Sequence, residues 1–199
     1  MSFDIAALAQ QLLDAGVVRF GSFTLKDGRQ SPVYFDLRVL IARPALLKRI
    51  AAAMVERARA IPHDCLAGLP YAGLPIAVAM SIAGDTPLVY PRKEAKDYGT
   101  KKRVEGIFSP GARALVIDDV ITTGGAKLEA LAPLREAGLS VQDILVVIDR
   151  EQADLDSLRN AGLRLHSLAR VSDLLTELER AGSVSPTDIA RARAFLQTH

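Results

Sequence analysis

The chain has 199 residues, of which 49% are apolar and 24% are charged, and its formal net charge is +2. This length suits one domain with a sizeable core, and the composition is typical of an α/β protein. No stretch approaches the roughly 20 apolar residues of a transmembrane helix, and the amino-terminal segment lacks the basic start of a signal peptide. The single cysteine, Cys65, excludes an intrachain disulfide. We therefore expect a cytoplasmic protein rather than a membrane protein or a disulfide-rich secreted one.

The positive charge is concentrated in one short segment, residues 92–106 (RKEAKDYGTKKRVEG). Six Lys or Arg and three Asp or Glu give this segment a net charge of +3, so the remaining residues sum to −1. A protein that binds nucleic acid usually carries its basic residues over a broad face. The pattern therefore predicts a local anion site and no nucleic-acid partner.

The amino-terminal part is predicted to form a helix, a hairpin and a second helix. Residues 1–16 (MSFDIAALAQQLLDAG) have the apolar spacing of an amphipathic helix. Two strand-like runs then flank Asp27-Gly28, which is a strong hairpin signal. Residues 44–60 again show helical spacing, and Pro44 suits a first helical turn.

The middle of the chain alternates short apolar runs with helical patterns. The expected strands are residues 65–69, 87–90, 112–118, 143–149 and 163–169. The expected helices are residues 74–84, closed by Gly84, 126–138, ending at Gly138, and 154–162. Because strands of a buried parallel sheet are apolar throughout, this alternation predicts a mostly parallel sheet flanked by helices.

The whole chain, residues 1–199, is predicted to be a single α/β domain. Its sequence contains no internal repeat, low-complexity tract or linker. The expected parts are a small N-terminal hood at about 1–40, an α/β core at about 65–169, and two C-terminal helices at about 172–181 and 186–197.

The stretch Ala114–Ala126 (ALVIDDVITTGGA) joins an apolar strand to a helix through two acids, two threonines and two glycines. Ligands of open parallel sheets bind beyond the carboxyl ends of the strands, where Asp118 and Asp119 are expected. Threonine hydroxyls, glycine N–H groups and a helix N-terminus suit a phosphate, whereas two carboxylates suit hydroxyl groups or a hydrated cation. A ribose 5-phosphate offers both kinds of group. The chain has no G-x-G-x-x-G and no G-x-x-x-x-G-K-[ST], which excludes two other nucleotide motifs.

VIDDVITTGGA, residues 116–126, resembles the 5-phosphoribosyl 1-diphosphate (PRPP) loop of type I phosphoribosyltransferases. Four other segments resemble the orotate phosphoribosyltransferases, especially the version in UMP synthases. They are TLKDGRQSPVYFDLR (24–38), GLPYAGLPIA (68–77), RKEAKDYGTKKRVEG (92–106) and VIDREQ (147–152). With the tail, the resemblance covers essentially the whole chain. It implies a type I phosphoribosyltransferase-like fold, and a pentosyltransferase that converts orotate and PRPP to orotidine 5′-monophosphate and pyrophosphate in pyrimidine biosynthesis.

The resemblance assigns catalytic roles to Lys96, Asp118 and Asp119. Lys96 corresponds to the lysine of a mobile loop that reaches the leaving pyrophosphate, and the two acids meet the ribose hydroxyls. Tyr71 and Ala72 present backbone N–H groups to the pyrophosphate, and many bacterial relatives have a lysine where this chain has Ala72. The implied PRPP-binding residues are Lys26, Tyr71, Ala72, Arg92, Lys93, Lys96, Tyr98, Asp118, Asp119, Val120, Ile121, Thr122, Thr123, Gly124, Gly125 and Ala126.

The resemblance also implies an orotate pocket. Arg150 corresponds to an arginine that pairs with the orotate carboxylate, and a bidentate pair would select orotate over uracil, which lacks that group. Lys26 corresponds to a lysine near the junction of orotate and PRPP, and Tyr34 and Phe35 to an aromatic pair beside the orotate ring. The implied orotate-binding residues are Lys26, Tyr34, Phe35, Thr122 and Arg150.

Mg²⁺ is the implied cofactor. It arrives with PRPP and reaches Asp118 and Asp119 through water, so no direct protein ligand is expected. The implied partners are the small molecules orotate and PRPP and a second copy of the chain, in a homodimer whose loop is shared across subunits. No nucleic acid and no membrane are expected.

Two other functions stay open at this point. A phosphoribosyltransferase for a purine or for uracil would keep residues 118–126 but would not need Lys26 and Arg150 to meet a carboxylate. A non-catalytic regulator that senses PRPP would keep the fold and often carries a DNA-binding segment. The first 20 residues are too short for a helix-turn-helix domain, and the charged segment 92–106 favours the enzyme.

Overall fold

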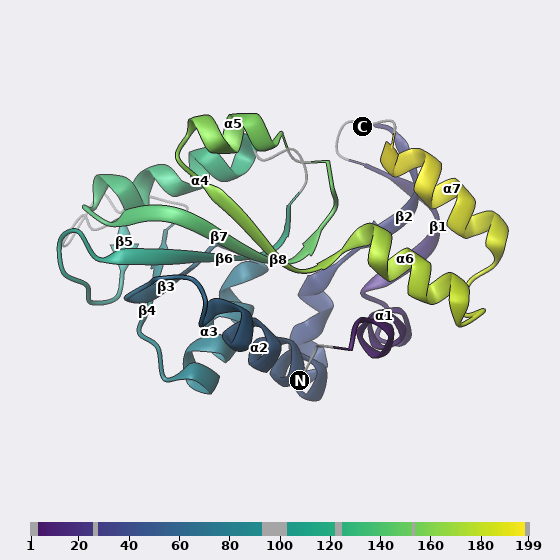
Figure 1. The fold of residues 1–199 in the computed structure, drawn as a ribbon, viewed down its shortest axis with the longest axis horizontal. Coiled ribbons are helices and arrows are strands. Elements are labelled where there is room, and N and C mark those ends of the chain that lie inside the picture. The colour runs from purple at the N-terminus through teal and green to yellow at the C-terminus, as the bar shows by residue number, and fades with distance from the viewer. Residues whose placement is uncertain (1–3, 26–27, 93–102, 122–124, 153, 198–199) are drawn as a thin grey trace.

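The computed structural model describes residues 4–25, 28–92, 103–121, 125–152 and 154–197. Within them, a six-stranded sheet has the order β5-β4-β3-β6-β7-β8 (Figure 1). Its strands are β3 (Cys65–Gly68), β4 (Leu88–Pro91), β5 (Val104–Glu105), β6 (Arg113–Ile121), β7 (Ser140–Asp149) and β8 (Arg164–Arg170). Every neighbouring pair is parallel except β4 with β5. The predicted α/β fold with a mostly parallel sheet is therefore confirmed.

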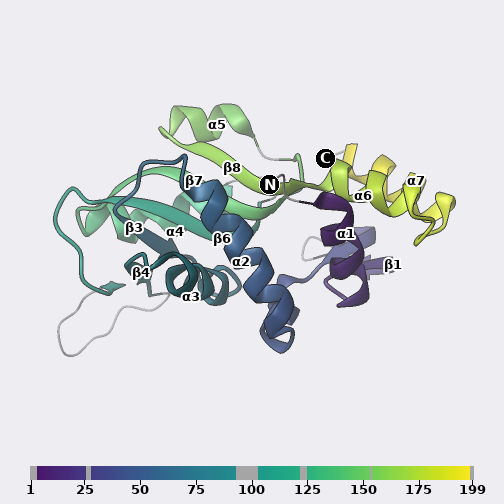
Figure 2. The same cartoon turned by 60° about the horizontal axis from the view of Figure 1, so that its bottom comes forward.

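Helices cover both faces of this sheet, as Figures 1 and 2 show. On one face lie α2 (Pro44–Ala58) and α3 (Gly73–Gly84), and on the other lie α4 (Gly125–Glu136) and α5 (Leu155–Asn160). Met54, Met80 and Ile117 are fully buried in the first core, and Leu131 and Val146 in the second. Each such side chain contributes about 1.5–3 kcal/mol of burial free energy. The two apolar cores hold the sheet rigid beneath the loops that leave its edge.

The amino-terminal hood and the carboxy-terminal helices form one unit beside the sheet (Figure 1). The hood consists of α1 (Ile5–Asp14) and an antiparallel pair, β1 (Val18–Thr24) with β2 (Gln30–Phe35), and the tail consists of α6 (Val171–Arg180) and α7 (Pro186–Gln197). Helix α1 packs against α6, and α7 against β2. The hydroxyl of Ser183 also donates to the side-chain oxygen of Gln10 at 2.5 Å. The two ends of the chain therefore assemble together.

Several predicted boundaries differ from the structure. Strand β6 runs to Ile121, three residues past the predicted end at Asp118, because Val120 and Ile121 continue the pairing with β7. The acids thus lie within the last four residues of the strand. Helix α3 is ended by Asp85, which takes the left-handed conformation (φ 48°), while Gly84 is still helical.

Two short elements were not predicted: the 3-10 helix η1 (Leu37–Ala42) and the edge strand β5. No element was assigned to residues 37–42, and β5 lies at the end of the charged segment 92–106. Among the helices of the described residues, none is long and apolar enough to cross a lipid bilayer.

Candidate active site at the carboxyl edge of the sheet

The strand order reverses between β3 and β6. From β3 the chain proceeds outward to β4, whereas from β6 it proceeds in the other direction to β7 and β8. Open α/β sheets bind ligands beyond the carboxyl ends of the strands at such a point. Residues 69–72 follow β3, and Asp118 and Asp119 lie in the last four residues of β6. The topology therefore brings these described parts of the two segments predicted to bind PRPP to the same edge of the sheet.

The start of α3 lies directly against β6. The N–H of Leu69 donates to the carbonyl of Ile117 at 3.0 Å. A Cβ atom on Gly73 would lie 2.7 Å from that same carbonyl oxygen and 2.8 Å from Oδ1 of Asp118. Side chains do not pack at such distances, so only glycine permits this approach. The turn predicted to bind pyrophosphate and the acid predicted to bind ribose are therefore in direct contact.

Asp118 and Asp119 (the acid pair) and residues 69–73, which lead into α3 (the α3 turn), have complementary charge. Asp118 is only 5% exposed, and its Oδ1 accepts the N–H of Asp119 at 2.8 Å. Ala72, the residue that precedes α3, makes no side-chain capping hydrogen bond, and Tyr71 beside it is 69% exposed. The first N–H groups of a helix carry partial positive charge and attract anions. This edge can therefore hold a group that carries both phosphate oxygens and hydroxyls.

The acid pair also bears on metal binding. Among the described residues, no group of three or more His, Cys, Asp or Glu side chains is placed to hold a metal ion. Asp118 and Asp119 supply two neighbouring carboxylates, one of them buried and bonded to backbone. Mg²⁺ keeps several waters and is often held by one or two carboxylates together with substrate phosphates. The residues present fit a hydrated Mg²⁺ whose other ligands come from the substrate.

Arg150 and Phe35, two of the residues predicted to bind orotate, lie together. The N–H of Arg150 donates to the carbonyl of Ile121 at 3.3 Å, at the end of β7, and its guanidinium carbon lies 5.8 Å from the centroid of the Phe35 ring. Burial lowers the pKa of Arg150, and the nearby cation of Arg29 lowers it further. Its Nε is buried and has no hydrogen-bond partner among the described residues. Because a buried donor without a partner is costly, an anionic ligand would stabilise this arrangement.

Tyr34 belongs to a different cluster. Its ring stacks on Phe23 with the centroids 5.4 Å apart, and the guanidinium carbon of Arg19 lies 5.3 Å from its centroid. Arg38 Nη2 donates to the Tyr34 hydroxyl at 3.3 Å. Neighbouring side chains on a strand point to opposite faces. The structure therefore brings Phe35, but not Tyr34, to Arg150.

Arg29 is a residue that the sequence reasoning did not select. Its guanidinium carbon lies 5.9 Å from the centroid of the Phe195 ring, and its positive charge lowers the pKa of Arg150. The available signal was a second cation in the same segment as Lys26. With Arg29 included, the region around Arg150 carries two arginines, which suits an anionic group.

The remaining predicted residues have simpler positions. Arg92 Nη1 donates to Glu105 Oε1 at 2.9 Å. The side chain of Ile121 is fully buried, so this residue would reach a ligand only through its backbone, and the partly buried side chain of Val120 packs against the core. Gly125 and Ala126 open helix α4. Seven predicted residues lie outside the described part of the chain: Lys26, Lys93, Lys96, Tyr98, Thr122, Thr123 and Gly124.

Known proteins resemble this chain in sequence and in fold. The model of the phosphoribosyl transferase domain family matches residues 40–161. Orotate phosphoribosyltransferase from Pyrococcus abyssi is 41% identical over 169 residues, which are 84% of this chain and 93% of that protein. The structure of UMP synthase from Leishmania donovani has a TM-score of 0.91 and 38% identity, covering 99% of this chain and 43% of that one.

A further solved structure contains a ligand. Orotate phosphoribosyltransferase of Mycobacterium tuberculosis H37Rv in complex with PRPP has a TM-score of 0.70 and 28% identity, covering 86% of this chain and 99% of that one. The chain spans about two fifths of the length of the UMP synthases that it matches.

Proposed function

The chain belongs to the orotate phosphoribosyltransferase family, which has the type I phosphoribosyltransferase fold, and we propose that it transfers the 5-phosphoribosyl group of PRPP to orotate. The products are orotidine 5′-monophosphate and pyrophosphate, in pyrimidine biosynthesis. One observation carries the proposal. The partly buried Arg150, whose Nε atom is fully buried, has its guanidinium over the Phe35 ring at the same sheet edge as the acid pair and the α3 turn. A carboxylated aromatic ring fits the first pair, and a phosphorylated sugar fits the second.

At the sugar end, catalysis depends on positioning and charge. Breaking the bond at ribose C1 leaves positive charge on the sugar and negative charge on the leaving pyrophosphate. Asp118 and Asp119 hold the ribose hydroxyls, and the backbone N–H groups of Tyr71 and Ala72 face the pyrophosphate. Groups that are fixed before the reaction stabilise developing charge at no further cost of reorganisation. The Gly73 contact supports this assignment because it fixes the distance between the turn and the acids.

At the base end, charge selects the substrate. The Arg150 guanidinium pairs with the orotate carboxylate, and Phe35 lies against the ring. Since the Arg150 side chain is partly buried, water screens this pair less than it would screen an exposed one. Arg29 adds a second positive charge to the same region. For Lys26 and Lys96, which lie outside the described residues, we propose the roles that the resemblance implies: Lys26 acts at the junction of orotate and PRPP, and Lys96 acts on the pyrophosphate and helps to exclude water.

Mg²⁺ is the proposed cofactor. When bound with PRPP, it supplies positive charge to the pyrophosphate group as that group leaves. Asp118 and Asp119 would hold it through water, as their placement on β6 allows. We also propose a cytoplasmic location.

A homodimer is supported by the surface of α3. The sequence of this helix, GLPIAVAMSIAG, is apolar on all sides, yet Val78 is 42% and Ile82 79% exposed. A helix that is apolar all round is normally buried. A second copy of the chain would cover this face, next to the α3 turn of the site. Sedimentation of Ile82→Glu tests this: a monomer is expected, and an unchanged dimer would contradict it.

The decisive experiment follows orotate absorbance with PRPP and Mg²⁺, omitting each component in turn, and repeats it with uracil, hypoxanthine and adenine. Of the four bases, only orotate should be consumed, and only when PRPP and Mg²⁺ are both present. Arg150→Ala should raise the KM for orotate much more than that for PRPP. Arg159→Ala, an exposed arginine of α5 paired with Asp156, is the matched control and should change neither. The proposal would be overturned if the protein used a purine but not orotate as substrate. It would also be overturned if the protein bound nucleic acid and turned over none of the four bases.

A further inference from the structure

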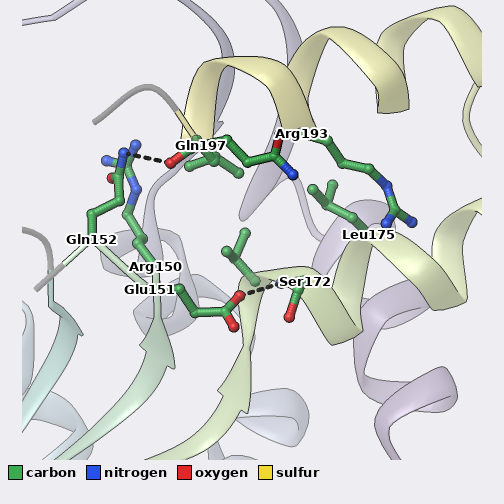
Figure 3. Close-up of a pocket in the computed structure, with 9 residues that line it drawn as sticks. Arg150, Glu151, Gln152, Ser172, Leu175, Arg193 and Gln197 are labelled. Carbon is green, nitrogen blue, oxygen red and sulfur yellow. Dashed lines mark hydrogen bonds between the residues drawn. The ribbon is translucent and has the colours of Figure 1, made fainter.

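Two residues that follow Arg150 connect it to both carboxy-terminal helices (Figure 3). Oε2 of Glu151 accepts the N–H of Ser172, in the first turn of α6, at 2.9 Å. Nε2 of Gln152 donates to the carbonyl of Leu196, in the last turn of α7, at 3.4 Å. The two ends of a helix leave such backbone groups without intrahelical partners.

Glu151 acts as the cap of α6 from a distant part of the chain. The residue that precedes this helix, Arg170, makes no side-chain capping hydrogen bond. Glu151 itself takes a left-handed backbone conformation, with φ of 60°. Non-glycine residues rarely adopt it, and it persists where surrounding contacts hold it. The hydrogen bond to Ser172 is such a contact.

Hydrogen bonds rather than packing set the distance between this segment and the helices. A cavity of about 440 Å³ separates them, lined by Arg150, Glu151, Gln152, Val171, Ser172, Leu175, Arg193, Leu196 and Gln197 (Figure 3). A packed interface would resist displacement of the segment over its whole area. Beyond the last β7–β8 pair, Asp149 with Arg170, the two hydrogen bonds join the segment to the helices across this cavity.

We propose that Glu151 and Gln152 are positioning residues, which hold the Arg150 guanidinium over Phe35 and so set the affinity for the carboxylated base. This inference rests on the proposed function. Arg150 has few other contacts that could fix it: its N–H bonds to Ile121, its Nε has no partner among the described residues, and Phe35 lies beneath it. The backbone on its carboxyl side is held by the two tethers. Helices α6 and α7 thereby help to position Arg150 in the proposed base pocket.

The test uses one variant for each tether. Glu151→Ala removes the acceptor, and Gln152→Glu keeps the shape of the side chain but cannot donate to the Leu196 carbonyl. Each should raise the KM for orotate about tenfold, since small misplacements of a binding group are costly. The KM for PRPP and the kcat at saturating orotate should stay near the wild-type values. Glu151→Gln retains an acceptor oxygen and should restore the KM.

Ser185→Ala is the matched control. Ser185 accepts the N–H of Asp188 at the opposite end of α7, so its loss weakens the same helical pair without touching the tethers. An equal rise in orotate KM in this control, or an unchanged KM in both tether variants, would overturn the inference. A crystal structure of Glu151→Ala with the Arg150–Phe35 contact intact would overturn it too, independently of activity. Failure of the wild-type protein to use orotate would instead refute the proposed function.

Discussion

Gly73→Ala should uncouple the two halves of the sugar site. The added Cβ would lie 2.7 Å from the Ile117 carbonyl oxygen and 2.8 Å from both Cα and Oδ1 of Asp118, whereas ordinary contact begins at 3.4 Å. The obstructing atoms are mostly backbone, so α3 must move away by roughly 0.7 Å. Overpacking of this kind costs about 1–3 kcal/mol of stability. A shift approaching 1 Å between groups that bind one substrate can lower kcat/KM by on the order of 10–100-fold.

The assay is orotate consumption at varied PRPP, with unfolding in urea measured in parallel. Gly84→Ala is the matched control, because it lies in the same helix and its Cβ would meet only side-chain atoms, the Val55 methyl groups at 3.2 Å and Thr86 Oγ1 at 3.4 Å. It should leave kcat/KM for PRPP unchanged. A Gly73→Ala protein with normal kcat/KM for PRPP would refute the assignment of the α3 turn to the pyrophosphate, whatever its stability.

Three further predictions concern single side chains. Lys96→Ala should lower kcat roughly 100-fold or more without changing the unfolding midpoint; near-normal turnover would contradict its role at the pyrophosphate. Hydrogen bonds from Arg164 hold the pKa of Asp143 below its usual value. The ionised carboxylate therefore stabilises the folded state fully above about pH 4, its usual pKa. This stabilisation is lost as the pH falls through the lowered pKa. In urea titrations, Asp143→Asn should thus be less stable than wild type at pH 7, and the difference should vanish in acid; a pH-independent difference would contradict this cause. Burial raises the pKa of the Cys65 thiol, so a disulfide reagent should modify this thiol far more slowly in the native protein than in denaturant. Equal rates would contradict this and would show that β3, which contains Cys65, opens in the native protein.

The core of the fold was predictable because its strands are buried on both faces. Strands β6 and β7 read as continuous apolar runs, and the helices between strands show their own period. The end of β6 was misplaced for a physical reason. Asp118 and Asp119 interrupt the apolar run, but backbone pairing with β7 continues to Ile121. A hydrophobic pattern reports where side chains are buried, whereas a strand ends where its hydrogen-bond ladder ends.

The contacts around Arg150 in the proposed base pocket were predictable only in part, because they join residues far apart in the chain. Tyr34 and Phe35 are adjacent in sequence, yet Phe35 meets Arg150 while Tyr34 stacks on Phe23. No local pattern indicates that Glu151 bonds to α6 or Gln152 to α7. The hood carries Phe35 and is itself packed on these helices. It follows that the proposed base pocket takes its shape only when the two ends of the chain have come together, whereas the proposed sugar site is built from β3, α3 and β6.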